Sequence, residues 1–297
     1  MKKFLLFLFV CISHQLFAQE EPYFRDMRSW SLYMNGTDTI DRYIFADTAY
    51  IRISPDTKQP PADTLMAGDN ITVTGVTTKS LTIRGIQGPW LKIAYTKNGE
   101  YRKGYIWQGL VSCAPLRRGD LKFVYGIERR ADSIAVSGNQ RDTFPKYLVR
   151  LKVVQNGVLL AKAAQIIGDD ESANSSYGKV MSGMGLTNVQ HIVVLTFSGE
   201  ACGIPTDDYY FAWTKDGQLI QLPSRTNIGD ADAYYHSEEF TFPNEKNGQP
   251  DMIVWNMEEA EATDKVDKDG MHVMKVTDKK SKRYIWDTEN KKVTATR

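Results

Sequence analysis

Apolar and polar residues alternate in short runs over much of the chain, and this alternation is typical of β-strands with one buried face. In the first half of the chain the alternating apolar positions are Ile51, Ile53, Ile71, Val73, Leu91 and Ile93. Helical periodicity is scarce, and only residues 256–265, acidic at the start and ending in lysine, favour a helix or a turn. The pattern therefore predicts an all-β protein.

Tight-turn signals divide the second half of the chain into hairpins, after a polar break at residues 117–120. Asn156-Gly157 separates the apolar runs 147–154 and 158–167, and Asp216-Gly217 separates 209–213 from 218–222. Further β-type runs are 189–197, 252–255, 272–276, 283–286 and 291–294, with a lysine-rich turn expected at 279–283. These signals predict a larger antiparallel β domain over residues 117–297, built as a meander, a sandwich or a propeller-like array.

The first eighteen residues have the pattern of a Sec signal peptide. Lys2 and Lys3 precede an apolar run at residues 4–12, and Leu16-Phe17-Ala18 provides a cleavage site after Ala18. The apolar run is too short to span a bilayer, which needs about 20 residues, so we expect no membrane span. The sequence thus predicts a secreted or periplasmic protein, with residues 19–43 as a lead-in to the first domain.

Charge and cysteine content narrow the class of partner. Loss of Lys2 and Lys3 lowers the number of basic residues from 37 to 35, against 36 acidic ones, which gives a net charge of −1. The mature chain therefore has no excess of positive charge to attract nucleic acid or an anionic membrane. The mature chain keeps Cys113 and Cys202. An exported protein permits a disulfide between them, and two buried free thiols are the alternative.

Four short motifs follow one another between residues 44 and 116. They are Arg52 with Pro55; Leu65, Gly68 and Asp69; Gly88, Trp90 and Ile93; and Gly104, Tyr105 and Ile106. In this order and spacing the segment resembles a bacterial SH3 (SH3b) domain. The resemblance implies a small barrel that binds peptides or proteins and catalyses no reaction. One departure is the longer stretch between Thr74 and Gly88, which predicts a lengthened loop.

Aromatic residues of this segment supply a candidate ligand groove. We assign Trp90 to the core and build the groove from Tyr50, Tyr101, Tyr105 and Trp107. Exposed tyrosine and tryptophan rings offer a large contact area with little conformational entropy to lose. For Tyr101, Tyr105 and Trp107, burial in the barrel core is the alternative.

Catalytic and metal-binding patterns are weak. Cys202, considered with His191 or His236, is followed by Gly203-Ile204-Pro205 and by no helix that would activate a thiol, so no catalytic residue is predicted. Asp230, Asp232, His236 and Glu238 alternate like one face of an exposed strand, and residues 267–270 are predicted to form a tight turn. We therefore expect neither a metal nor a cofactor.

Together these features predict a non-enzymatic exported protein in which an SH3b-like barrel binds cell-wall (peptidoglycan) peptide or an envelope protein. The alternatives are a protein–protein interaction scaffold of the envelope and an unrecognised cell-wall hydrolase. The sequence does not distinguish a periplasmic from an extracellular location.

Overall fold

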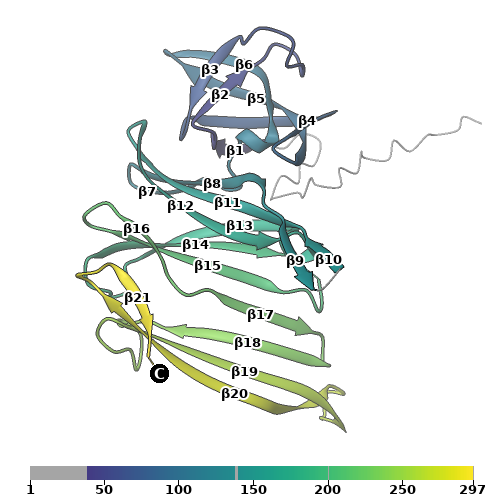
Figure 1. Cartoon of the computed structure of the whole chain (residues 1–297), viewed down its shortest axis with the longest axis vertical. Coiled ribbons are helices and arrows are strands. Elements are labelled where there is room, and N and C mark those ends of the chain that lie inside the picture. The colour runs from purple at the N-terminus through teal and green to yellow at the C-terminus, as the bar shows by residue number, and fades with distance from the viewer. Residues whose placement is uncertain (1–38, 138–139, 200, 297) are drawn as a thin grey trace, which may run out of the picture.

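A computed structural model describes residues 39–137, 140–199 and 201–296 of the chain (Figure 1). These residues form 21 strands and two short 3-10 turns, η1 (Gln108–Leu110) and η2 (Glu171–Ala173). Neighbouring strands pair in antiparallel fashion throughout the sheets, so the prediction of an antiparallel all-β protein is confirmed. Within the described ranges, no helix has the length and apolar character needed to cross a membrane. The signal-peptide prediction and most of the lead-in segment lie outside these residues.

The first region contains a four-stranded sheet and a two-stranded ribbon. The sheet has the order β1 (Ile40–Tyr43), β4 (Asn70–Ile83), β5 (Ile86–Lys97), β6 (Glu100–Trp107), and the ribbon joins β2 (Thr48–Ile51) to β3 (Asp63–Met66). Both surround one core that includes Ile51, Leu65, Val73, Leu91 and Ile106. The ribbon meets β6 at the isolated bridge between Arg52 and Tyr105 instead of a continuous ladder, so no sheet in the described residues closes into the expected barrel.

The stretch between Thr74 and Gly88 is a hairpin extension and not the loop expected from the sequence. Strand β4 runs to Ile83 and β5 starts at Ile86, with Arg84 and Gly85 at positive φ in the turn. The extended hairpin is stabilised from outside the first region, because Leu81, Ile83 and Ile86 pack with the core of the second region. The sequence between Thr74 and Gly88 does not indicate this packing, because the residues that provide it lie far away in the chain.

The second region begins with a four-stranded sheet of order β12 (Val158–Gly168), β11 (Lys146–Gln155), β8 (Leu121–Arg130), β7 (Leu116–Arg118). A separate hairpin, β9 (Ser133–Ser137) with β10 (Gln140–Phe144), projects from it. A nine-stranded sheet follows, of order β13 (Ser175–Ser182), β14 (Val189–Ser198), β15 (Thr206–Thr214), β17 (Arg225–Asp230), β18 (Tyr234–Thr241), β19 (Met252–Val266), β20 (His272–Asp287), β21 (Lys292–Ala295), and β16 (Leu219–Gln221) pairs with β15.

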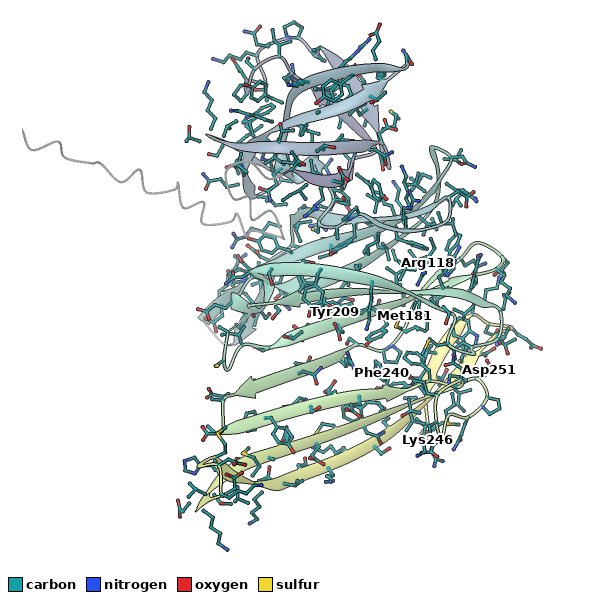
Figure 2. All side chains as sticks on the ribbon, turned by 180° about the vertical axis from the view of Figure 1, so that it is seen from behind. Arg118, Met181, Tyr209, Phe240, Lys246 and Asp251 are labelled. Carbon is teal, nitrogen blue, oxygen red and sulfur yellow. The ribbon has the colours of Figure 1, made fainter. Side chains whose placement is uncertain are left out.

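These sheets stack as layers (Figure 1). The four-stranded sheet packs on one face of β13–β15 through Phe123, Leu151, Val193 and Phe211, which makes a sandwich. On the opposite face, Ile192, Val194 and Tyr210 pack against Phe242, Ile253 and Trp286, because the C-terminal strands of the large sheet turn back beneath it. Phe240, labelled in Figure 2, lies in this C-terminal layer with its ring centroid 5.2 Å from that of Tyr210. The second region is therefore a sandwich at one end and a meander at the other.

The two regions share a buried interface. Tyr43, Phe45 and Ala67 of the first region pack with Val124 and Val154 on the outer face of the four-stranded sheet. Lys152 of β11 reaches across, and its ammonium donates to the Phe45 carbonyl at 2.5 Å and pairs with Asp47 at 2.9 Å. The first region therefore rests directly on the sandwich as its outermost layer.

Most local predictions of strands and turns agree with the structure. Asn156 and Gly157 adopt positive φ between β11 and β12, as the hairpin signal predicts. Residues 256–265 form strand and not helix, and the lysine-rich 279–283 lies inside β20 and not in a turn. Both errors have one cause, because the two segments pair with each other along β19 and β20, where Glu258 lies opposite Lys279.

Candidate functional site

The tyrosines of the predicted groove lie on the outer surface of β2 and β6. Arg52 and Tyr105 exchange two backbone hydrogen bonds, Arg52 N–H to Tyr105 O at 2.9 Å and Tyr105 N–H to Arg52 O at 2.8 Å. Because alternate residues of a strand share a face, Tyr50 lies on the side of Arg52, and Tyr101 on the side of Tyr105. Tyr50 is 52% exposed and Tyr101 67% exposed, while Tyr105 is half-buried between them.

One apolar side chain from the neighbouring strand β3 and two cations, Arg52 and Lys103, belong to the same surface. Met66 of β3 is exposed. It faces the same side as Tyr50, because Tyr50 pairs with Thr64, and Met66 lies two residues after Thr64 on the same strand. The Lys103 ammonium lies 6.0 Å from the Tyr101 ring centroid, and the Arg52 guanidinium donates to the Gln59 carbonyl. We call the set Tyr50, Arg52, Met66, Tyr101, Lys103 and Tyr105 the tyrosine face.

Trp107, the fourth predicted groove residue, is not on this surface. It is 4% exposed, and its indole N–H donates to the Gly88 carbonyl at 3.1 Å. The Trp107 ring packs against Gly109 so closely that a Cβ added to this glycine would lie 2.2 Å from the ring. Trp107 also belongs to the hydrophobic core shared with the second region. Trp107 therefore holds the two regions together, and the assignment of Trp90 to the core is confirmed.

A buried ion-pair cluster, which the sequence analysis missed, braces the ribbon beneath the tyrosine face. The Asp63 carboxylate is 7% exposed and accepts from Lys97 at 2.5 Å and from Arg102 at 2.8 Å. Burial alone would raise the pKa of Asp63, but hydrogen bonds from Lys97, Thr64 and Arg102 hold it at about 2. The cluster ties β3 to β5 and β6, and no local sequence signal marks Asp63 as buried.

Among the described residues, no cysteine–histidine pair is assembled. Cys202 is exposed and lines an open pocket of about 750 Å³ together with His236, yet no hydrogen bond joins the two. The His236 imidazole instead contacts Glu259 through Nδ1 at 2.8 Å and Glu238 through Nε2 at 3.0 Å. With both nitrogens engaged by carboxylates, His236 has no free position from which to take a proton from Cys202.

Burial lowers the pKa of His236, but the two carboxylates outweigh it and the net shift is upward, so this histidine is part of an ion-pair network.

The prediction that Asp230, Asp232, His236 and Glu238 share one strand face is wrong. Asp230 ends β17, Asp232 lies in the turn that follows, and only His236 and Glu238 lie on β18. Within the described ranges, no group of three or more histidine, cysteine or acidic residues is arranged to hold a metal ion. Asp267 caps a tight turn, with its carboxylate accepting from the Asp269 and Met271 backbone N–H groups, as predicted for residues 267–270.

Cys113 and Cys202 do not form a disulfide. Cys113 is buried, and this burial raises the pKa of its thiol to about 12, whereas Cys202 lies at the surface. The sequence left open a disulfide or two buried free thiols. The structure has two free thiols, of which only Cys113 is buried.

Comparison of the chain with protein-family models, with curated proteins and with solved structures found no match.

Proposed function

We propose that this is an exported, non-enzymatic binding protein whose tyrosine face recognises an extended peptide of the bacterial cell wall. The observation that carries the proposal is the exposure of Tyr50 and Tyr101 on one surface with Tyr105 between them. Aromatic side chains on a rigid strand face are a common basis of peptide recognition, because they add contact area at low entropic cost.

The charges of the face fit the same kind of ligand. Arg52 and Lys103 present cationic groups beside the rings, and wall stem peptides carry free carboxylates. A guanidinium or ammonium group donates charge-assisted hydrogen bonds to a carboxylate. The resemblance of residues 44–116 to SH3b domains and the Sec-type pattern of residues 1–18 support the same role, since both are features of exported wall-binding proteins.

The test is co-sedimentation of residues 19–297 with purified peptidoglycan. We expect the protein to pellet, and Tyr50→Ala and Tyr101→Ala each to weaken binding by roughly tenfold, which corresponds to about 1.4 kcal/mol for loss of one aromatic contact. Tyr177→Ala is the matched control, because Tyr177 is 51% exposed on β13, away from the tyrosine face.

Equal binding of all three variants would refute the role of the tyrosine face. Failure of the wild-type protein to pellet would refute wall recognition. A specific protein partner that is retained after removal of the wall would then favour the envelope-scaffold alternative.

A further inference from the structure

The sandwich of the second region is open at one end. Four chain segments surround this opening: the β7–β8 turn, the β11–β12 hairpin, the start of β14 and the β15–β16 turn. They line an open pocket of about 740 Å³, within the usual range for sites that hold a small molecule. Arg118, labelled in Figure 2, marks this end of the sandwich. The pocket lies in the second region and shares no residue with the tyrosine face.

The inner part of the pocket is apolar. Leu121 and Trp213 line it and are themselves buried in the sandwich core, and Leu160 of β12 forms an apolar wall that is 42% exposed. Such a surface suits the C–H face of a ring better than a charged group, because an ion would lose its hydration there without a partner.

His191 contributes a polar atom that the fold leaves without a hydrogen bond. Its Nδ1 is buried and has no hydrogen-bond partner among the described residues, while the ring packs edge-on against Phe123 with centroids 6.1 Å apart. Burial and the nearby Arg118 guanidinium lower the pKa of His191, so the imidazole is neutral near neutral pH. A neutral imidazole offers one donor and one acceptor, and a hydroxyl group satisfies either.

The rim supplies further groups that bind hydroxyls. Asp120 accepts from the Gln155 side chain at 2.7 Å, and Gln190 stands exposed beside His191. Asp216 lies across the opening, where it accepts from Asn188 at 3.1 Å and forms an ion pair with Lys291. Arg118 and Lys215 also line the pocket, so its two carboxylates are balanced by two cations and the lining has no net charge that would select an ionised ligand.

We propose that the mouth of the sandwich is a binding site for a neutral saccharide. A sugar ring would place its C–H face on Leu160 and its hydroxyls on the His191 imidazole and on the amide and carboxylate groups of the rim. The site is independent of the tyrosine face, so either proposal can fail while the other holds.

The test is a titration of residues 19–297 with neutral disaccharides containing glucose, galactose, mannose and N-acetylglucosamine, up to about 10 mM, followed by NMR of the histidine imidazoles. At least one sugar is expected to shift the His191 resonances saturably, with a Kd of about 1 mM or tighter, equivalent to about −4 kcal/mol. Glucuronic acid is expected to bind no more tightly than glucose, because the pocket lining has no net positive charge. Absence of a saturable shift with all four sugars would overturn the proposal.

Two pairs of variants separate binding from folding. Leu160→Arg, which fills the pocket, should weaken binding at least tenfold, whereas Val158→Arg on the same strand, 58% exposed and outside the pocket, should leave it unchanged. His191→Phe keeps the edge contact with Phe123 and removes the nitrogens, so it should also weaken binding, and His191→Gln should retain more affinity than His191→Phe. Wild-type affinity in Leu160→Arg would refute the assignment of the site.

Discussion

Phe45 lies where the first region rests on the sandwich, and its truncation to alanine measures how strongly the two are joined. The side chain is 4% exposed and packs with Val124 and Val154. Its ring faces Gly126, where an added Cβ would lie 2.9 Å from the ring carbon Cγ. The Lys152 ammonium lies 4.4 Å from the ring centroid.

The expected loss follows from these contacts. Truncating a buried phenylalanine to alanine costs about 3–5 kcal/mol, as the sum of lost transfer free energy and the cavity left behind. Gly126 has no side chain that could move into the space, so the cost should lie in the upper part of that range. The contact between Lys152 and the ring adds about 0.5–2 kcal/mol when desolvated, and it is lost too.

The assay is urea denaturation of residues 19–297, followed by tryptophan fluorescence. Since Trp107 and Trp213 belong to one core spanning both regions, we expect a single transition. Phe45→Ala should lower the free energy of unfolding by about 5 kcal/mol, the sum of the cavity cost and the lost contact with Lys152. Phe144→Ala is the control, because Phe144 is 50% exposed on the β9–β10 hairpin, and its change should stay within about 0.5 kcal/mol. A loss below about 1 kcal/mol in Phe45→Ala, or a separate transition for the first region, would refute this account of the interface.

Three further predictions concern single groups. Asp63→Asn should lower the free energy of unfolding by about 1–2 kcal/mol, discounted because the two cationic partners of Asp63 are partly exposed. The folded-state pKa of Asp63 is lowered to about 2, and Asp47 and Asp216 titrate in the same range, so the stability difference between wild type and Asp63→Asn should shrink as pH falls from about 4 to 2; a difference in urea midpoints that stays constant over this range would contradict this. In native residues 19–297, a thiol reagent should label Cys202 at once and Cys113 only after unfolding, whereas equal rates would show that Cys113 is not buried. Gly104→Val should cost about 1–3 kcal/mol in urea denaturation, because its Cβ would lie 2.5 Å from Ile51 Cγ2, and an unchanged midpoint would show that β2 does not pack on β6.

Features set by neighbouring residues were predictable. The Asn156-Gly157 hairpin and the strand at Val189–Ser198 follow from turn chemistry and from β-branched runs, which act over a few residues. Period-two alternation likewise identified Ile51 and Ile71 as buried core positions, because a strand directs alternate side chains to opposite faces whatever its partner. The same pattern was wrong for Ile53, which is 69% exposed because β2 ends at Ile51.

Features set by distant partners were not predictable. The lysine-rich segment 279–283 is predicted as a turn from its own sequence. It forms a strand because it pairs with the acidic strand β19. The local sequence of Trp107 is compatible with a surface groove and with a core position. Trp107 is buried because it contacts residues of the second region. The buried Asp63 cluster joins residues 34 and 39 positions apart, a spacing with no sequence pattern.

The sequence by itself thus determined the β-class, the hairpin turns and the alternating core positions, because backbone conformation and strand periodicity depend on short-range sterics. Tertiary structure alone decided which sheets stack, which aromatic side chains stay exposed at Tyr50 and Tyr101, and where the sandwich remains open beside His191. Burial depends on which surface each strand meets, and that surface is supplied by residues far away in the chain.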